Sequence, residues 1–513
     1  MKTDPFLFTK IVATLGPASA SVNVMRKMIE AGVRVFRINF SHGTFEEYES
    51  YFDKVREAER LTGEYVAILG DLSGPKIRVG KVIKNGVLLR KGQLVEFVKQ
   101  PVVAGEKNTE CVFSSTYPHF IDEIKKGEKI LIDDGNLQVT CIEKTSGNKN
   151  RKLICRVERG GLITSAKGIN LPDSVLSVPS LTKKDYACVK FAVAKGFDFL
   201  ALSFVRSGTD VKVLKKELIR LGARPKSIRK SGNRFDFSHF FEDAKNYIPV
   251  ISKIEKPQAI DNLQSIIDET DGIMIARGDL GVEMDLAEVA ILQKKIAKMC
   301  HESGKPVIVA TQMLQSMIES PVPTRAEVSD VANAIFDGTD AVMLSGETAV
   351  GKYPVETVKM MNRIAEKTND YIRSEKQIEG VYIQRTEIFS RTSALAHGVS
   401  TIVNDIKPKL IVTWTRSGGS SVFLSQQRLH VPIIAFGENI NRLRQLAVLF
   451  SIKPAYMKQP LSGSAFITTV DKLLIKNKWA QHGDPVIIVT GDPITKPGIV
   501  NRIVIHYVGE SVE

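Results

Sequence analysis

At 513 residues the chain is too long for one ordinary hydrophobic core, and its length predicts about three domains. Hydrophobic residues make up 43% and charged residues 25%, and no apolar run reaches the roughly 20 residues that span a bilayer, so we expect a soluble protein without a membrane partner. The formal net charge is +14, but lysine and arginine are dispersed rather than gathered in basic tracts, which favours small anions over nucleic acid.

The N-terminus and the cysteines predict a cytoplasmic location. Residues 1–19 lack the apolar core and the small-residue cleavage site of a signal peptide. The cysteines lack the paired spacing of a zinc site and the even count of a disulfide framework, so we expect reduced, structural thiols. They are Cys111, Cys141, Cys155, Cys188 and Cys300.

From residue 8 to about 375, short β-branched runs alternate with longer amphipathic stretches, a pattern typical of repeated βα units. The runs predict eight strands, at residues 9–16, 33–41, 65–73, 197–205, 249–255, 272–279, 306–312 and 340–347. Between them we predict helices, for example at 21–31, 44–60, 182–195 and 284–303. This order fits a closed (β/α)8 TIM barrel of the α/β class better than an open sheet.

The third connection interrupts this rhythm with about a hundred residues of short strands and glycine turns. We therefore predict a catalytic barrel at 1–74 and 179–375, an inserted small β-barrel domain at 75–178 and a C-terminal α/β domain at 376–513. The insertion falls where barrels carry active-site loops, so we expect a lid that closes over substrate, a passive insertion being the alternative.

The C-terminal domain has predicted strands at 410–415, 432–436 and 485–491. A Ser/Gly loop follows the first of them and matches a phosphate-binding loop before a helix, although a simple connector is nearly as good an explanation. Its residues are Thr415, Arg416, Ser417, Gly418, Gly419 and Ser420.

Polar side chains that a hydrophobic core would not accept follow nearly every predicted barrel strand. Catalytic groups in such barrels come from the C-terminal ends of the strands, so we expect these side chains to converge. They are Arg37, Asn39, Ser41 and His42 after the second strand, Asp71, Lys76 and Arg78 after the third, Ser203 after the fourth, Lys253 and Glu255 on the fifth, Arg277, Gly278 and Asp279 after the sixth, Thr311 and Gln312 after the seventh, and Ser345, Gly346, Glu347 and Thr348 after the eighth.

Lys253 and Glu255 alternate with Ile254, so they share one face of an otherwise apolar strand. A structural ion pair would explain them, but Asp279 on the next strand supplies a second carboxylate, and two carboxylates with waters suit Mg2+ or Mn2+. We therefore predict a divalent metal between Glu255 and Asp279, used with Lys253 on a small phosphorylated acid. Free amides near Gly278, where the chain turns into a helix, suit a substrate carboxylate.

One motif is a false lead. The segment 346–352 fits a phosphate-binding P-loop until position 353, where Tyr353 replaces the magnesium-binding Ser or Thr. We therefore expect any nucleotide to be held in another way.

Six segments together resemble the pyruvate kinase family: RINFSHG at 37–43, VISKIEKPQAI at 250–260, MIARGDLG at 274–281, ATQMLQSM at 310–317, PTRAEVSDVANA at 323–334 and MLSGETA at 343–349. The resemblance covers nearly the whole chain, with barrel, lid and C-terminal regulatory domain in order. It implies that phosphoenolpyruvate and ADP give pyruvate and ATP.

The same resemblance implies roles for individual residues. Glu255 and Asp279 would hold Mg2+, while Lys253 and Arg37 neutralise the transferring phosphoryl group. For the proton that the pyruvate enolate takes up, Thr311, Lys253 and a relay through Ser345 remain alternatives. The remaining implied contacts are Ser203 for the substrate phosphate, Ala276, Arg277, Gly278, Asp279 and Thr311 for substrate binding and its carboxylate, and Asn39, His42, Arg78 and Lys167 for the nucleotide.

Members of the family usually bind a monovalent cation through residues that match Asn39, Ser41, Asp71 and the carbonyl of Leu72. Members that require potassium tend to have Glu where this chain has Lys76. An ammonium group can replace K+ electrostatically, so the resemblance predicts that K+ is not required.

Two segments depart from the family pattern. Residues 223–247 are longer than the usual link between the fourth and fifth strands, and we assign them no role; residues 491–501 lack the usual Gly, Ser and Thr-rich effector segment. The resemblance implies a phosphorylated allosteric effector and a homotetramer. The alternatives are a metal-dependent barrel lyase acting on pyruvate or oxaloacetate and a noncatalytic binder, which would leave Lys253 and Glu255 unexplained.

Overall fold

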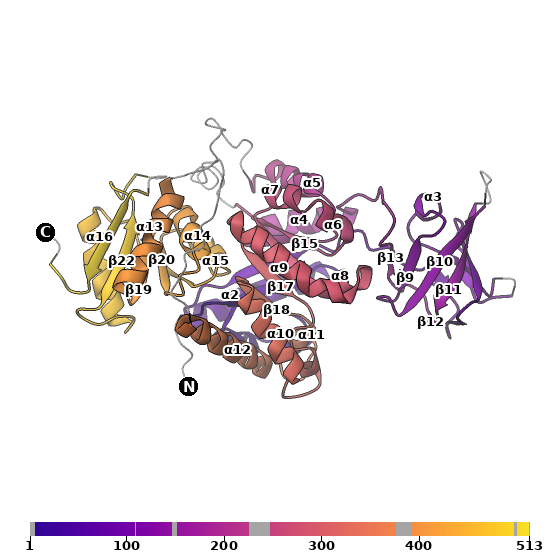
Figure 1. The fold of residues 1–513 in the computed structure, drawn as a ribbon, viewed down its shortest axis with the longest axis horizontal. Helices are drawn as coiled ribbons and strands as arrows, with labels where there is room; N and C mark the ends of the chain where they lie inside the picture. Colours follow the sequence, from indigo (N-terminus) through magenta and orange to yellow (C-terminus); the bar gives the residue numbers. More distant parts are fainter. Residues whose placement is uncertain are drawn as a thin grey trace.

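The protein is described by a computed structural model, which covers residues 6–107, 109–145, 151–224, 247–375, 391–496 and 500–511. In Figure 1 the C-terminal domain, the barrel and the lid follow one another along the long axis. Most of the 223–247 segment and the predicted start of the C-terminal domain at 376 lie outside the described residues. Every helix within these ranges is too short or too polar to cross a membrane.

The predicted closed barrel is confirmed. Its parallel strands follow the order β1-β18-β17-β16-β15-β14-β3-β2, and each lies inside one of the predicted runs. They are β1 (Lys10–Thr14), β2 (Val33–Asn39), β3 (Ala67–Asp71), β14 (Phe199–Leu202), β15 (Val250–Ile254), β16 (Gly272–Ala276), β17 (Val307–Ala310) and β18 (Ala341–Leu344).

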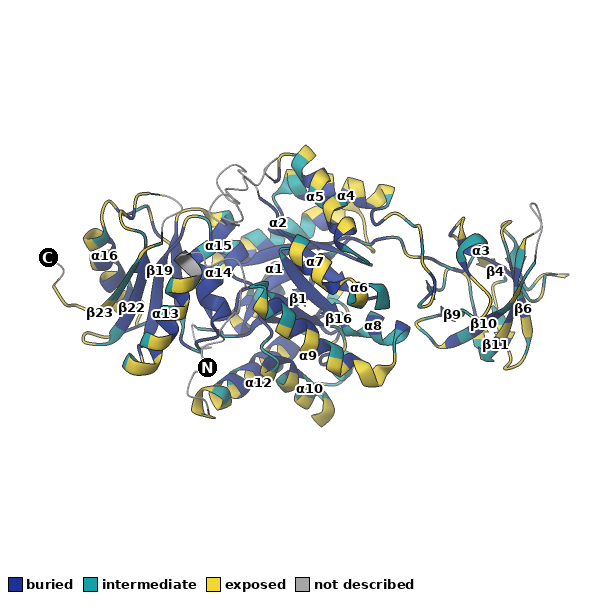
Figure 2. Cartoon of the chain, turned by 45° about the horizontal axis from the view of Figure 1, so that its top comes forward, coloured by how far each residue is buried: buried dark blue, intermediate teal, exposed yellow. Residues whose placement is uncertain are grey.

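The helices that surround the barrel are buried on their inward side and exposed outward (Figure 2). In α2, α4 and α10 a threonine hydroxyl and a Glu or Asp carboxylate form a capping box by binding each other's backbone amides, as at Thr44 and Glu47. The helices are α1 (Val22–Ala31), α2 (Phe45–Thr62), α4 (Lys183–Lys195), α5 (Gly208–Arg220), α6 (Pro257–Asp261), α7 (Leu263–Glu269), α8 (Arg277–Glu283), α9 (Leu286–Glu302), α10 (Arg325–Phe336), α11 (Gly346–Ala349) and α12 (Pro354–Glu375).

Alternate residues of the barrel strands serve two different cores. Ile11, Phe36 and Ile38 belong to the cluster that packs against the helices. Val12 and Leu69 point to the other side and share a second cluster with residues of the C-terminal domain. Because side chains alternate along a strand, an apolar run that is buried on both faces forms both cores at once.

The lid has its own hydrophobic core, separate from that of the barrel. Its main sheet follows the order β13-β9-β10-β11-β6-β8, and two short pairs, β4 with β7 and β5 with β12, flank it. The main sheet stays open between β13 and β8, so the lid is not one continuous closed ladder. Its elements are β4 (Lys81–Val82), β5 (Val87–Leu89), β6 (Leu94–Val98), β7 (Val103–Ala104), β8 (Val112–Ser114), α3 (Phe120–Glu123), β9 (Lys129–Ile132), β10 (Leu137–Lys144), β11 (Lys152–Arg159), β12 (Gly161–Ile163) and β13 (Ile169–Asn170).

The C-terminal domain is a sheet in the order β21-β20-β19-β22-β23, with helices packed on it. The three predicted strands are present. The edge strands β21 and β23 are partly exposed, so their sequences lack the continuous apolar run that marks the buried strands. The elements are α13 (Arg391–Ile406), β19 (Leu410–Trp414), α14 (Gly419–Gln426), β20 (Ile433–Gly437), α15 (Ile440–Leu446), β21 (Ile452–Tyr456), α16 (Gly463–Lys476), β22 (Pro485–Thr490) and β23 (Arg502–Tyr507).

Helix α15 attaches the C-terminal domain to the amino ends of two barrel strands. Arg444 binds both oxygens of Glu59, at 2.8 and 2.7 Å, and Glu59 accepts the amide of Val66 just before β3 at 3.1 Å. Gln445 donates to the carbonyl of Asp198 at 3.1 Å, and the Asp198 carboxylate accepts the amide of Ile68 at 2.7 Å. The C-terminal domain therefore holds the starts of β3 and β14.

A second attachment surrounds Asp340, which is fully buried just before β18. Its carboxylate accepts the amides of Val307 at 2.9 Å and Phe450 at 3.2 Å and the guanidinium of Arg428 at 2.8 Å. His301 lies beside this guanidinium, with Nε2 3.0 Å from Nη2 of Arg428. Burial, reinforced by the positive charge of Arg428, lowers the pKa of His301 to about 4.

This histidine predicts an acid-sensitive stability. The pKa of a histidine in the unfolded chain is near 6.5, whereas that of folded His301 is about 4. Between these pH values the unfolded chain binds a proton that the folded protein does not, so the free energy of unfolding falls as the pH falls. The loss across this window is about 3 kcal/mol. We expect His301→Gln to reduce the decline of the urea midpoint between pH 7 and 5, whereas exposed His482→Gln leaves it unchanged. Equal declines in wild type and His301→Gln would contradict this expectation.

Candidate active site

The predicted strand-end residues converge around Lys253, which is buried on β15. Its Nζ lies 2.7 Å from Glu255 Oε1 and 3.4 Å from Asp71 Oδ2, and it donates to the hydroxyl of Ser203 at 2.9 Å. Burial alone would lower the pKa of Lys253, but the charges of Asp71 and Glu255 raise it above its ordinary value. The lysine is therefore a fixed cation at the C-terminal end of the barrel.

Arg37 on β2 supplies a second cation. Its Nε donates to Asp71 Oδ2 at 2.7 Å and its Nη1 to the hydroxyl of Thr14 at 3.1 Å. Burial opposes charge on Asp71, but Lys253 and Arg37 outweigh it and hold the pKa of this carboxyl below its usual range. Asp71 thus stays ionised and orients both cations.

Glu255 and Asp279 have the properties expected of metal ligands. Burial, with the nearby charge of Asp279, raises the pKa of Glu255 although Lys253 opposes the shift. Glu255 Oε2 accepts the amide of Phe204 at 2.6 Å, whereas Asp279 forms no side-chain hydrogen bond or ion pair with any residue that the structure describes. A cation shared by these two carboxylates would relieve their repulsion, so the donor set fits Mg2+ or Mn2+.

The described part of the chain contains no group of three or more His, Cys, Asp or Glu side chains that could hold a metal ion. Two carboxylates would leave the other coordination positions of a metal ion to water and substrate. Mg2+ usually keeps several such positions because it dehydrates reluctantly.

Helix α8 begins at the end of β16 and places Gly278 beside Thr311. The amide of Gly278 donates to the hydroxyl of Thr311 at 2.7 Å, and an added Cβ at Gly278 would come within 3.2 Å of that oxygen. Thr311 has a left-handed backbone, with φ of 70°. Ala276 precedes the helix, while the guanidinium of Arg277 turns outward to Asp330 at 2.7 and 2.6 Å. The same guanidinium also donates to the Thr311 carbonyl at 3.2 Å, so the side chain of Arg277 is engaged by the protein itself.

Ser345 lies at the start of α11, half-buried, and its amide donates to Glu347 Oε2 at 2.7 Å. The neighbouring false P-loop forms no phosphate cradle of its own. An added Cβ at Gly351 would come within 2.4 Å of the Glu347 carbonyl, and Lys352 pairs with Glu319 at 2.5 Å.

Among the residues expected to bind a monovalent cation, Asp71 and Leu72 meet at Ser203. The hydroxyl of Ser203 donates to the Leu72 carbonyl at 2.7 Å. Asn39 Oδ1 accepts the amide of Ser41 at 3.1 Å, and Ser41 is exposed. Lys76 is also exposed and forms no ion pair with Asp71 among the described contacts; it lines a cleft between lid and barrel that also contains Asp279.

The residues expected to face the nucleotide are spread over barrel and lid. His42 is exposed after β2. Arg78 donates from Nη1 to the Ala166 carbonyl at 2.9 Å, and Lys167 pairs with Asp133 at 2.7 Å. In this arrangement both cations are engaged by the lid itself.

The Ser/Gly loop of the C-terminal domain has an ordered turn. Gly418 has φ of 90°, and its amide donates to the hydroxyl of Thr415 at 2.9 Å. Ser420 accepts a hydrogen bond from Thr413 at 3.2 Å. Arg416 contacts Gln459, Gly419 begins α14, and Ser417 lies between them.

Three contacts of the site were missed by the sequence analysis. Thr14 at the end of β1 binds Arg37, and the amide of Phe204 binds Glu255. Lys256, next to Glu255, pairs with Glu283 at 2.6 Å. Thr14 could have been found from its place at a strand end, but a backbone amide and an ion pair across 27 residues leave no sequence signal.

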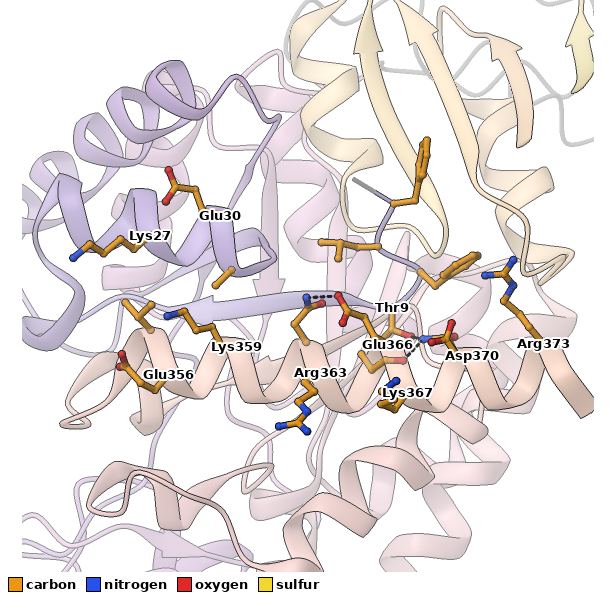
Figure 3. A pocket seen from close by; sticks show the side chains of 18 of the residues that line it. Thr9, Lys27, Glu30, Glu356, Lys359, Arg363, Glu366, Lys367, Asp370 and Arg373 are labelled. Atoms are coloured by element: carbon orange, nitrogen blue, oxygen red, sulfur yellow. Dashed lines mark hydrogen bonds between the residues drawn. The ribbon is translucent and has the colours of Figure 1, made fainter. Parts of the chain in front are cut away.

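A groove of about 1000 Å3 lies elsewhere, between α1, α12 and residues 6–9 (Figure 3). It is lined by charges of both signs, and inside it Asn369 donates to the hydroxyl of Thr9 at 3.1 Å. None of the predicted site residues lines this groove. The predicted Lys76 and Asp279 line instead the cleft between lid and barrel.

The fold and site define a (β/α)8-barrel enzyme with a charged centre at the strand ends and a lid above it. The family model described as "Pyruvate kinase, barrel domain" matches residues 7–240 and 226–358, and "Pyruvate kinase, alpha/beta domain" matches residues 393–506. The chain belongs to the pyruvate kinase family, which confirms the predicted resemblance.

Individual pyruvate kinases match this chain over nearly its whole length. The chain is 38% identical to a pyruvate kinase of Mycobacterium intracellulare, covering 98% of both chains. It is 38% identical to one of Geobacillus stearothermophilus, covering 98% of this chain and 80% of that one. A crystal structure of a pyruvate kinase from Cryptosporidium parvum matches with a TM-score of 0.86 and 30% identity, covering 98% of this chain and 96% of that one.

The geometry predicts that Lys253→Met abolishes most activity. Without the ammonium group, Asp71 and Glu255 lose their shared counter-ion and the site loses a fixed positive charge. We expect kcat to fall about 100-fold or more, as when one preorganised stabilising group is removed. Exposed Lys298→Met is the matched control and should behave as wild type in the same steady-state assay. A kcat for Lys253→Met within a few-fold of wild type would contradict the assignment.

Proposed function

We propose that this enzyme transfers the phosphoryl group of phosphoenolpyruvate to ADP, giving pyruvate and ATP, at the C-terminal end of its barrel. The observation that carries the proposal is the buried Lys253, bound to Ser203 and Glu255 and within electrostatic range of Asp279. Phosphoryl transfer needs charge neutralisation and alignment rather than covalent chemistry, and this cluster is suited to both.

Different residues of the site act on the phosphoryl group, on the substrate carboxylate and on the metal ion. Lys253 and Arg37, held 2.7 Å from Glu255 and Asp71 respectively, face the phosphoryl group, and Ser203 orients Lys253. The backbone at Ala276, Arg277 and Gly278, with the hydroxyl of Thr311, holds the substrate carboxylate at the start of α8. A Mg2+ or Mn2+ ion bound by Glu255 and Asp279 would supply further charge neutralisation.

The enolate left by the transfer must be protonated before pyruvate leaves. Lys253, Thr311 and a relay through Ser345 are the candidates. Lys253 has a raised pKa and therefore holds its proton tightly in the resting site. The hydroxyl of Thr311 donates to the Ala310 carbonyl at 2.6 Å and accepts from Gly278, so it would need to rotate before donating to substrate.

The three domains have different tasks in this proposal. The barrel at 1–74 and 179–375 carries the chemistry, the lid at 75–178 covers the nucleotide, and the domain at 376–513 regulates. Asn39, His42, Arg78 and Lys167 contact the nucleotide once the lid has closed, which would require Arg78 and Lys167 to exchange their present partners. The enzyme works in the cytoplasm as a homotetramer.

A coupled assay of ATP formation tests the reaction and its metal. ATP should form from ADP and phosphoenolpyruvate, stop after chelation with EDTA and resume with Mg2+ or Mn2+. Glu255→Gln and Asp279→Asn should each raise the metal concentration needed for half-maximal activity about tenfold or more, because each removes one carboxylate ligand. Exposed Glu288→Gln is the matched control. Cleavage of oxaloacetate without ATP formation would favour the lyase instead.

We also propose that Lys76 replaces the monovalent cation. Lys76 is exposed in the cleft, so its ammonium group would move toward Asp71 only when the lid closes on substrate. Activity at saturating substrate in buffer free of sodium and potassium should change less than twofold when K+ is added, as expected where a fixed charge already fills the site. Lys76→Glu should make activity depend on K+, and a large K+ activation of the wild type would refute the proposal.

The loop from Thr415 to Ser420 is proposed to bind the phosphate of an allosteric effector. Its support is the turn at Gly418, which places free amides at the start of α14. A panel of sugar phosphates and AMP should include one compound that lowers the concentration of phosphoenolpyruvate giving half-maximal rate, and Ser417→Glu should abolish that response by repulsion. No response to any of them would count against an effector site here.

A further inference from the structure

One side-chain contact between the lid and the barrel runs through the carboxylate of Glu283, at the end of α8. Glu283 Oε1 accepts a hydrogen bond from Asn170 Nδ2 of the lid at 2.9 Å and another from Lys256 Nζ of the barrel at 2.6 Å. Glu283 is buried, and its second oxygen, Oε2, has no hydrogen-bond partner among the described residues. Because the carboxylate is buried, both donors are needed to stabilise its charge, and the loss of either one is costly in free energy.

Both barrel members of this contact adjoin the proposed metal ligands. Lys256 follows Glu255 directly in the chain, and Glu283 lies four residues, or about one helical turn, after Asp279 on α8. Lys256 also lies over the ring of Phe204, 5.9 Å from its centre, and the amide of Phe204 binds Glu255. The contact is therefore connected to both proposed metal ligands, to Glu255 through Lys256 and to Asp279 through α8.

The contact also forms part of the wall of the cleft under the lid. Asn170 and Lys256 line this cleft together with Lys76 and Asp279. Figure 1 shows β13, which ends at Asn170, on the side of the lid that faces α6 and α8. A ligand held between lid and barrel would therefore lie beside it.

Other hydrogen bonds join the barrel to the segment that follows β13 in the lid. Gln258 donates to the carbonyls of Pro172 and Ser174, each at 3.3 Å, and Arg206 donates to that of Leu176 at 2.7 Å. These contacts fix the backbone after β13. The Asn170 contact differs because it joins a lid side chain to a charged pair beside the metal ligands.

We propose that Glu283, with Lys256 and Asn170, is a positioning device for the reaction: it sets the lid over the metal site and thereby determines how tightly the nucleotide is held. The inference rests on the proposed function, because it assumes that the nucleotide lies between lid and barrel. Glu283 acts through Asn170 and Lys256 and does not itself touch the substrate.

Asn170→Ala tests the device without leaving a charge unpaired, since Glu283 keeps Lys256. We expect KM for ADP to rise about tenfold, the scale of one lost hydrogen bond to a charged group, with KM for phosphoenolpyruvate within twofold of wild type. Asn170→Asp should act more strongly, because two carboxylates would then repel across the contact. Glu283→Gln, which leaves Lys256 unpaired, should resemble Asn170→Ala in its effect on ADP.

The matched control is Glu96→Gln, which breaks a lid ion pair of 2.6 Å with Lys152 that does not reach the barrel. It should leave both KM values unchanged. Thermal melting of each variant separates loss of folding from loss of positioning, and small-angle X-ray scattering should show a more extended Asn170→Asp variant. If the wild type is active and both Asn170→Ala and Asn170→Asp have the same KM for ADP as the wild type, the positioning role is refuted. If the wild type is inactive, the proposed function itself is refuted.

Discussion

The site depends on the balance of charge around Lys253. Taking an ammonium group and two carboxylates out of water is costly, and only close pairing compensates for that cost. Lys253 and Glu255, 2.7 Å apart, belong to the same strand end, but the 3.4 Å from Lys253 to Asp71 requires the ends of β15 and β3 to come together across β14, which a closed barrel provides. Arg37 completes the balance at Asp71, while Asp279 forms no ion pair with any residue that the structure describes.

Much of this arrangement could be predicted from the sequence, because buried parallel strands leave long apolar runs and polar residues at their ends stand out against them. The eight strands and the convergence of Lys253, Glu255 and Ser203 follow from that contrast. The partners of long cationic side chains could not be predicted in this way. Arg277 turns to Asp330, 53 residues away, and Lys167 to Asp133, 34 residues away, and such pairs form only when the fold brings them together.

The lid differs from the barrel in how it is held. Its own core keeps it folded, while a few polar contacts and two chain connections attach it. The orientation of the lid therefore depends on these few contacts and not on a hydrophobic core shared with the barrel. This makes the orientation of the lid adjustable without disturbing the packing on either side.

The C-terminal domain has the opposite relation to the barrel. Its residues share one hydrophobic cluster with the interior of the barrel, and α15 and Arg428 bind buried carboxylates at Glu59 and Asp340. Removing that domain would expose the cluster and leave the two carboxylates without these arginine partners. We therefore expect the barrel and the C-terminal domain to unfold together as one cooperative unit, and the lid, with its own core, to be able to unfold separately.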